Sequence, residues 1–259
     1  MKRAGFRLST SHGGKPLLVV TGLWPTDDLP SCGVFVQRRL EGVPATIIAA
    51  RSYRGSTAMR YLALLFRALT ARGSFQAVEA HVLFPTGLIG LFAARLRRIP
   101  LVVVAHGSDV RISAQKNMIS RYLGRRVARA AQVVVANSQD TARHVRKLGV
   151  EPKIVAPGVD LSRFWPTPRP SERRVLYLGG NRPSKGIEVA RQLADTLVGP
   201  GIRELPPDDV PSLIAEHDIM LIPSVEEGFG VVAAEAIASG RWVVARRVGG
   251  LSEVRIFIA

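Results

Sequence analysis

The sequence predicts an α/β fold in which parallel sheets are covered by helices on both faces. Short, continuously apolar runs recur along the 259 residues, and amphipathic helical patterns lie between them. Continuous rather than alternating apolarity is typical of strands that are buried on both faces, as in parallel sheets. Alternation of such strands with helices predicts doubly wound units with right-handed crossovers.

Seven apolar runs are the expected strands, and two helical patterns are clear between them. The runs cover residues 17–20, 46–49, 101–104, 132–135, 174–178, 219–222 and 242–245. Apolar residues at i, i+3, i+4 and i+7 predict a helix over 57–72, with a stripe made of Leu62, Leu65, Phe66 and Leu69. A looser pattern through 142, 145 and 148 predicts a second helix that ends at Gly149.

A proline-rich stretch predicts a boundary between two domains. Prolines at 166, 168 and 170 interrupt regular structure within 160–171 and would make a stiff linker. We expect a first domain over 1–165 and a second over 166–259. The first is long enough for a complete doubly wound domain, whereas the second is short.

Composition and charge limit the function classes. Lys and Arg number 36 against 20 Asp and Glu, so the formal net charge is +16 and phosphates, anionic lipids or other polyanions are attracted. No nucleic acid partner is expected, because the sequence lacks a reading module such as a helix-turn-helix. The single cysteine, Cys32, cannot form an internal disulfide, and no apolar run approaches the roughly 18 residues of a membrane span. We therefore expect a cytoplasmic protein.

The most informative segment runs from 222 to 240, where an apolar strand leads through a glycine-rich turn into a helix. Backbone N–H groups around Gly228, Phe229 and Gly230 lie at the helix N-terminus, which favours a phosphate or sugar oxygen. The glycines also let a ligand approach the backbone closely. Two carboxylates, Glu227 and Glu235, are separated by seven residues and can both point at one extended ligand.

This segment resembles the E-x7-E signature of retaining GT-B glycosyltransferases, family 4-like, including its Glu-Gly-Phe-Gly opening. The resemblance implies two Rossmann-like domains facing a cleft, an acceptor-side domain followed by a nucleotide-sugar-binding domain that is shortened here. It also implies that Glu227, a catalytic candidate, contacts hydroxyls of the donor sugar, and that Glu235 binds the nucleotide ribose. The peptides of Gly228, Phe229 and Gly230 would bind the donor. The alternative is a solvated loop Glu and a helix-face Glu without a function.

Further segments match the family in its usual order. Gly33 lies in a loop that resembles the one facing the donor phosphates or the acceptor. His106, in Ala105-His-Gly-Ser-Asp109, would line the donor-sugar pocket as a catalytic candidate, and Asp109 would shape the loop for donor binding. His81 lies in another matching segment, and a structural role for it stays equally open. Phe164 is expected to anchor the linker.

The second domain opens with a strand, a glycine turn and Lys185-Gly186, which match the family's Lys-Gly. A lysine at such a turn is a suitable point charge for a diphosphate leaving group, so Lys185 is the third catalytic candidate. The family's usual arginine five residues earlier is absent, because position 180 is Gly. Arg182, from the same loop, could substitute in donor binding.

The resemblance implies transfer of a sugar from a nucleotide-sugar donor, UDP- or GDP-linked, with retention of configuration. The acceptor would be a glycan, a lipid-linked molecule or a small molecule, and neither a cofactor nor an obligatory metal is implied. Three alternatives stay open, namely an inactive relic that binds nucleotide sugar, a basic polyanion-binding protein and a sugar-nucleotide epimerase. The relic reading rests on truncation, because relatives continue past the segment that matches Gly249-Gly-Leu-Ser-Glu253.

Basic helices in the first domain suggest where an acceptor could bind. Arg60 and Arg67 share a face of the helix expected at 57–72, and arginines recur at 121, 125 and 129. Basic amphipathic helices suit an anionic membrane surface that carries a lipid-linked acceptor, at the inner face of the membrane. Ordinary solvated faces are the alternative.

Overall fold

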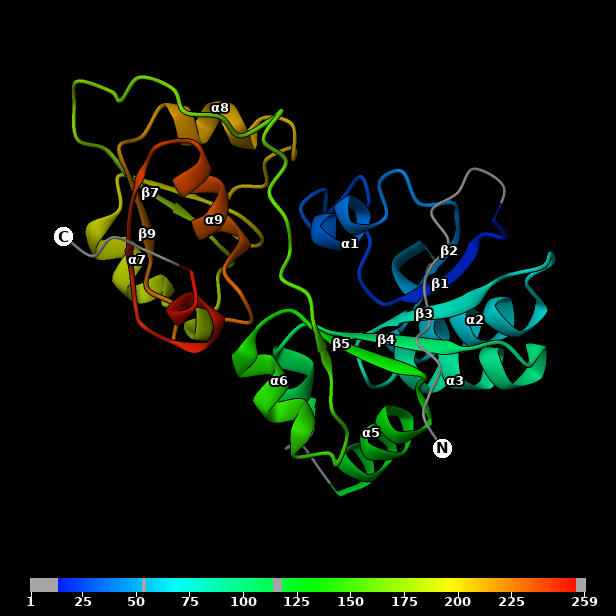
Figure 1. Ribbon diagram of the computed structural model, residues 1–259. Coiled ribbons are helices and arrows are strands. Elements are labelled where there is room, and N and C mark those ends of the chain that lie inside the picture. The colour runs from blue at the N-terminus through cyan, green and yellow to red at the C-terminus, as the bar shows by residue number, and fades with distance from the viewer. Residues whose placement is uncertain (1–13, 53–54, 114–117, 255–259) are drawn as a thin grey trace.

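The computed structural model describes residues 14–52, 55–113 and 118–254. Over this part of the chain two parallel sheets lie side by side, each with its own helices (Figure 1). The first sheet has the strand order β2-β1-β3-β4-β5-β6. Its strands are β1 (Leu17–Thr21), β2 (Ala45–Ala49), β3 (Ala77–His81), β4 (Leu101–Ala105), β5 (Val133–Ala136) and β6 (Lys153–Ile154).

The second sheet has four strands in the order β10-β9-β7-β8. They are β7 (Val175–Leu178), β8 (Thr196–Val198), β9 (Ile219–Ile222) and β10 (Trp242–Ala245). In both sheets the strand order reverses beside the first strand, between β1 and β3 and between β7 and β9. Open α/β sheets bind ligands outside the carboxyl ends of the strands at such a point.

All seven expected strands are confirmed, and three strands were not predicted. The expected runs correspond to β1, β2, β4, β5, β7, β9 and β10. The additional strands are β3, β6 and β8. β6 and β8 are short, whereas β3 is a five-residue central strand whose apolar run is interrupted by Glu79 and His81.

The described helices cover the faces of the two sheets. In the first domain they are α1 (Val34–Arg39), α2 (Thr57–Thr70), α3 (Thr86–Arg97), α5 (Met118–Ala130) and α6 (Gln139–Arg146). In the second they are α7 (Ile187–Leu193), α8 (Val210–Ala215) and α9 (Val231–Ala238). Figure 1 shows α2, α3 and α5 along one face of the six-stranded sheet and α1 on the other. The helices expected over 57–72 and before Gly149 are therefore confirmed as α2 and α6.

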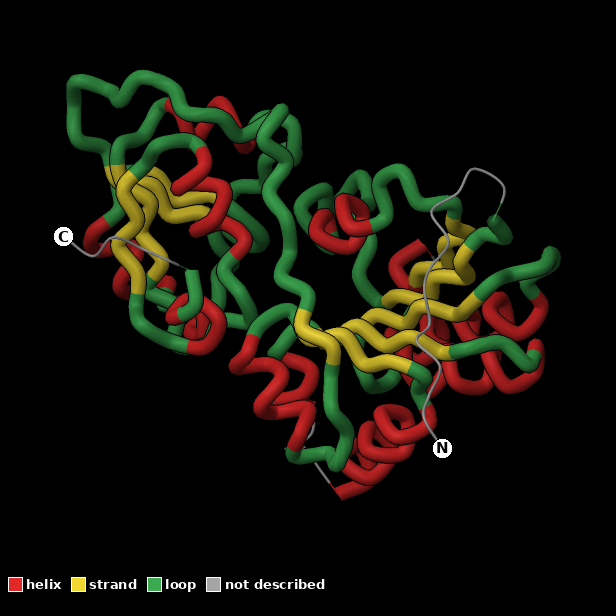
Figure 2. The backbone as a smooth tube through the Cα atoms, viewed as in Figure 1, coloured by secondary structure: helices red, strands yellow, loops and turns green. Residues whose placement is uncertain are grey.

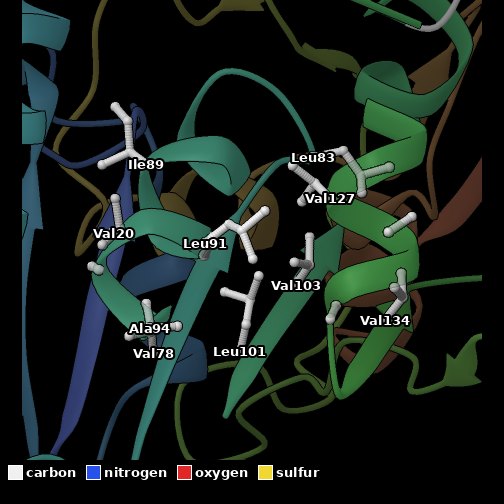
Figure 3. Close-up of a cluster of buried hydrophobic side chains, with 14 of the residues drawn as sticks. Val20, Val78, Leu83, Ile89, Leu91, Ala94, Leu101, Val103, Val127 and Val134 are labelled. Atoms are coloured by element: carbon white, nitrogen blue, oxygen red, sulfur yellow. The ribbon is translucent and has the colours of Figure 1, made fainter. Parts of the chain in front are cut away.

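The main core lies between the six-stranded sheet and the helices α2, α3 and α5. Figure 3 shows Leu91 of α3 and Val127 of α5 directed toward Val103 of β4. The stripe expected on α2 is rotated, because the helix buries Leu64 and Ala68 while Leu62 and Phe66 are 67% and 65% exposed. Burying each Leu or Val of this core contributes about 1.5–3 kcal/mol.

An irregular linker connects β6 to β7 (Figure 2). Phe164 of this linker is fully buried in the core of the second sheet, which fits its expected role as an anchor. The guanidinium of Arg38, from α1, lies 5.3 Å from the centre of the Phe164 ring. The exact boundary at 165/166 remains a prediction.

The two domains meet backbone to backbone. Gly107 follows β4 with φ 103°, and a Cβ on it would lie 2.8 Å from Gly228 Cα. A Cβ on Gly228 would lie 2.1 Å from the carbonyl oxygen of His106, closer than any real contact allows. Glycine at 228 is therefore required for this approach of the two domains.

We predict that Gly228→Ala separates this contact and lowers the free energy of unfolding by about 1–3 kcal/mol, the usual cost of overpacking. Urea unfolding measures it. The control is Gly124→Ala on α5, where an added Cβ meets no atom within 4 Å. That change should instead stabilise the protein by roughly 0.5–1 kcal/mol, because alanine is the better helix former. Equal stability of Gly228→Ala and the wild type would contradict the contact.

Candidate functional site

Two of the predicted catalytic residues form an ion pair in the second domain. Lys185 ends a short helical turn over Pro183–Lys185, and its Nζ lies 2.7 Å from Oε2 of Glu227, in the loop after β9. The side chains are 34% and 17% exposed, so both can still be reached from solvent. A Cβ at Gly186 would lie 2.2 Å from the carbonyl oxygen of Pro223, so the two loops pack closely. Their packing holds the ammonium and the carboxylate together.

The N-terminus of α9 lies directly beside this pair. Gly230 is the N-cap in the left-handed region, φ 91°, and no side chain caps the helix. Gly228 N donates a hydrogen bond of 3.2 Å to Oε1 of Glu227. Uncapped N–H groups at a helix N-terminus carry partial positive charge and can bind an anion. The peptide N–H of Gly228 and the ammonium of Lys185 thus bind the two oxygens of one carboxylate, just before the start of α9.

Glu235, on the second turn of α9, forms an ion pair with Arg38 of the first domain. The residue is 4% exposed, and burial raises the pKa of its carboxyl while Arg38 acts to lower it. Both charges are therefore neutralised without a ligand. A ribose that bound to Glu235 would have to share or displace Arg38.

His106 and Asp109 follow β4 at the edge of the first domain. Burial, with a smaller contribution from the nearby cation of Arg39, lowers the pKa of His106 to about 3, so its ring is neutral at physiological pH. Oδ1 of Asp109 accepts hydrogen bonds from the N–H groups of His106 (2.9 Å) and Gly107 (3.0 Å). Its Oδ2 accepts one from Leu83 N at 3.2 Å. Burial raises the pKa of Asp109, against these hydrogen bonds.

Asp109 therefore organises two loops and has its oxygens directed at the backbone. Asn137, directly after β5, donates a hydrogen bond of 3.1 Å from Nδ2 to the carbonyl oxygen of His106. That oxygen is the atom against which Gly228 packs. The β4 loop is thus fixed from both sides.

Among the described residues, no side-chain hydrogen bond or ion pair joins Gly33 or Arg182 to another candidate, although the carbonyl oxygen of Arg182 accepts a hydrogen bond of 3.0 Å from Lys185 N. Gly33 is the N-cap of α1 with φ 78°, and a Cβ there would lie 2.6 Å from the backbone of Leu23. In the structure Gly33 forms the turn that starts α1, and this helix carries Arg38. Arg182 is exposed, and no described residue pairs with its side chain.

Sequence reasoning missed three residues that join the domains near the site. Arg38 pairs with Glu235, as described above. Arg111 pairs with Asp140, and its Nη2 donates a hydrogen bond of 2.9 Å to the carbonyl oxygen of Glu227. Glu253 accepts hydrogen bonds from the N–H groups at the start of α6, of 2.7 and 2.9 Å. Arg111 and Glu253 both lie within or beside family-like motifs, and that proximity was the available signal.

Within residues 14–52, 55–113 and 118–254, no cluster of three or more His, Cys, Asp or Glu side chains could hold a metal ion. In the same part of the chain no helix has both the length and the apolar character needed to span a membrane.

Two family models match the chain in succession. Residues 12–158 match a glycosyl transferase 4-like domain, and residues 161–256 match glycosyl transferases group 1. A D-inositol 3-phosphate glycosyltransferase of Geodermatophilus obscurus is 31% identical over 242 residues, covering 69% of this chain and 53% of the relative. The enzyme of the same name from Rhodococcus erythropolis is 27% identical over 243 residues, and the match covers 69% of this chain and 54% of the relative. The chain spans about half the length of these curated relatives.

Solved structures share the fold. A sucrose-phosphate synthase from Thermosynechococcus elongatus superposes with a TM-score of 0.74 at 17% identity, covering 92% of this chain and 83% of that one. The catalytic domain of starch synthase IV from Arabidopsis thaliana, bound to ADP and acarbose, superposes with a TM-score of 0.63 at 11% sequence identity. The match covers 93% of this chain and 84% of that one. Identities this low show only the fold, which confirms the expected GT-B architecture. The two family models and the 31% identical relative show that this chain belongs to the family 4-like, group 1 glycosyltransferases.

Proposed function

We propose that the protein is a retaining glycosyltransferase that transfers a sugar from a nucleotide-sugar donor, UDP- or GDP-linked, to an acceptor. The observation that carries the proposal is the pair Lys185–Glu227, 2.7 Å apart, next to the uncapped N-terminus of α9. A fixed cation and the N-terminus of α9 would face the diphosphate, and a carboxylate would face the sugar. Family membership supplies the reaction class.

Breaking the bond between sugar and phosphate puts negative charge on the nucleotide diphosphate. Lys185 and the peptides of Gly228, Phe229 and Gly230 would stabilise that charge more as it grows, which is what lowers a barrier. Glu227 would orient Lys185 and accept hydrogen bonds from sugar hydroxyls. We propose that Arg182 adds charge from the same loop. These fixed cations would replace a metal ion.

We propose further that Glu235 binds the ribose, in exchange with Arg38, and that His106 lines the sugar pocket as a neutral hydrogen-bonding group. Asp109 and Gly33 would serve donor binding by shaping the loops around it. The two glutamates are both ion-paired, one with Lys185 and one with Arg38. Neither is left as the free carboxylate of a two-carboxylate hydrolase, so we favour departure and attack on one face of the sugar.

The acceptor is a glycan, a lipid-linked molecule or a small molecule. The name of the matched relatives, D-inositol 3-phosphate glycosyltransferase, supports a small phosphorylated acceptor as one candidate. The formal charge of +16 would favour any anionic acceptor.

The first experiment is incubation with a panel of UDP- and GDP-sugars, with and without phosphorylated polyols, and detection of released or transferred sugar by mass spectrometry. We expect donor-specific turnover, and a loss of about 10²–10³-fold in kcat for Lys185→Ala. Glu227→Gln should lose activity to a similar degree. The matched control is Glu226→Gln, at the exposed neighbouring position, which should keep wild-type activity.

Several outcomes would contradict the proposal. A folded protein that binds one nucleotide saturably but turns over no donor would support the inactive relic instead. Salt-sensitive retention without nucleotide preference would support a polyanion-binding protein. Interconversion of donor sugars without an acceptor would support an epimerase. Full activity of Glu227→Gln would refute the assigned donor site.

The glycine at 180 gives a second test, since the family's usual arginine would fit there. An added Cβ would meet its nearest atoms at 3.7 Å or more, at ordinary contact distance. We predict that Gly180→Arg tightens binding of UDP or GDP about tenfold, because a charge-assisted hydrogen bond to phosphate is gained. Calorimetric titration measures this, with Gly180→Ala as the uncharged control. Unchanged affinity would argue against a diphosphate beside this loop.

We propose that the face formed by α2, α3 and α5 rests on an anionic membrane, at the cytoplasmic side. Met118, Ile119 and Tyr122 of α5 are 86%, 70% and 59% exposed, and Arg121 and Arg129 are exposed on the same helix. Apolar side chains are also exposed on α2 (Met59, Leu62, Phe66) and α3 (Phe92, Leu96). Apolar residues flanked by arginines are typical of helices that lie in a membrane interface.

We predict that the protein sediments with vesicles containing phosphatidylglycerol and not with pure phosphatidylcholine. Each Arg near such a surface contributes about 1 kcal/mol. Ile119→Ser combined with Tyr122→Ser should abolish binding, whereas Leu161→Ser, at an exposed apolar residue of the linker, should not. Equal binding to neutral vesicles, or none to either, would refute the proposal.

A further inference from the structure

Central strand β3 carries two buried polar side chains that the proposed chemistry does not use. Glu79 is 2% exposed and His81 is fully buried. In the sheet, Glu79 pairs with Val19 of β1 and Val102 of β4, so apolar residues flank it on both sides. A buried carboxylate is costly unless it is paired, and hydrophobic residues of similar volume are often as stable. Stability alone therefore does not account for Glu79.

These side chains form a continuous chain that ends at His106. The Arg39 guanidinium, at the end of α1, donates hydrogen bonds of 3.0 and 3.3 Å to the two oxygens of Glu79. Glu79 Oε1 lies 3.2 Å from Nε2 of His81, at ion-pair distance although short of good hydrogen-bond geometry. Nδ1 of His81 lies 3.0 Å from Nε2 of His106. Burial would raise the pKa of Glu79, but contacts with His81 and Arg39 lower it to about 2, so Glu79 is ionised.

The negative charge of Glu79 determines which ring nitrogens of His81 and His106 carry a proton. An ionised carboxylate next to Nε2 of His81 favours the ring tautomer that carries its proton on that nitrogen, and in this tautomer Nδ1 is an acceptor. Nε2 of neutral His106 must then carry the proton that it donates to His81. Nδ1 of His106 is left unprotonated.

The last nitrogen of the series is Nδ1 of His106. Among the described residues it has no hydrogen-bond partner, it is not one of the fully buried atoms that lack one, and His106 as a whole is half-buried. The Phe35 ring, with its centre 4.8 Å from that of His106, flanks the imidazole at an angle of 63°. A group that reaches this nitrogen must donate a hydrogen bond. Hydroxyl groups of a sugar are such donors.

We propose that Glu79 and His81 are positioning residues that hold His106 in the tautomer whose Nδ1 accepts a hydrogen bond from a sugar hydroxyl. The inference rests on the proposed function for the identity of the hydroxyl, but the tautomer itself does not depend on turnover. Outer partners commonly fix the tautomer of a functional histidine in this way. This tautomer would select among donor sugars, because the hydroxyl that meets Nδ1 cannot be replaced by a group that only accepts hydrogen bonds.

The direct test is nitrogen NMR of the protein labelled at histidine, recorded at pH 7 without any donor. Chemical shifts distinguish protonated from unprotonated ring nitrogens, and His106→Asn assigns the signals among the 5 histidines. We expect His106 to be protonated at Nε2 alone. Glu79→Gln keeps the volume but can donate as well as accept, so both tautomers of His106 should become populated. Glu41→Gln, at an exposed position, is the control and should change nothing.

Kinetics give a second measurement once a donor is known. Glu79→Gln should lower kcat/KM about tenfold, the effect of one lost hydrogen bond. A series of donor sugars in which one hydroxyl at a time is replaced by fluorine should be compared with the matching deoxy sugars. At the position that meets Nδ1 of His106, the fluoro and the deoxy donor should be equally poor substrates, because fluorine cannot donate a hydrogen bond. If Glu79→Gln does not fold, Glu79→Met removes the carboxylate while restoring an apolar strand.

The outcomes separate the two proposals. A proton on Nδ1 of His106 in the wild type, or an unchanged tautomer in folded Glu79 variants, would overturn the inference even if the enzyme is active. The expected tautomer in a protein that turns over no donor would overturn the proposed function and leave the arrangement of protons intact.

Discussion

The close approach of two glycine backbones determines where the other site residues can lie. Gly107 and Gly228 leave no room for a side chain between the β4 loop and the loop before α9. Because the contact involves main-chain atoms of both domains, it fixes distances that flexible side chains would leave variable. The N-terminus of α9 is thereby held against the carbonyl oxygen of His106. A single methyl group at 228 would disturb both halves of the site.

Around this contact, the charged side chains of the candidate site are paired with other groups of the protein. Arg38 neutralises Glu235, Lys185 neutralises Glu227, and the carboxylate of Glu253 binds the start of α6. Buried charges without partners would be expensive, so each cation offsets part of the cost of burying the carboxylate that it pairs with. An anionic ligand that entered between the domains would exchange partners with these pairs. Its affinity would therefore reflect the difference between two sets of ion pairs, and not the sum of the new contacts.

The fold was largely predictable because its strands are continuously apolar. Runs such as 101–104 and 219–222 can be buried on both faces only in a covered sheet, and both are strands. In the candidate site the arrangement that is local in sequence was predictable, since Glu227 and the peptides that follow it do lie between a strand and the start of a helix. The pairing of Glu235 with Arg38 was not, because it joins residues 197 positions apart through the arrangement of two domains. Periodicity likewise could not tell which side of α2 is buried, since apolar side chains lie on both.

β3, one of the three strands that the sequence did not predict, shows why such failures are informative. β3 reads Ala-Val-Glu-Ala-His, and a buried Glu and His break the apolar run on which the prediction of strands depends. Local patterns agree with the fold wherever packing alone selects the residues, and they are broken where another requirement does. Here that requirement is electrostatic, since Glu79 is ionised in the middle of a sheet. In our proposal its charge draws the ring protons of His81 and His106 toward Glu79 and leaves Nδ1 of His106 unprotonated. The break in the pattern therefore marks the part of the first domain for which we propose a role in donor binding.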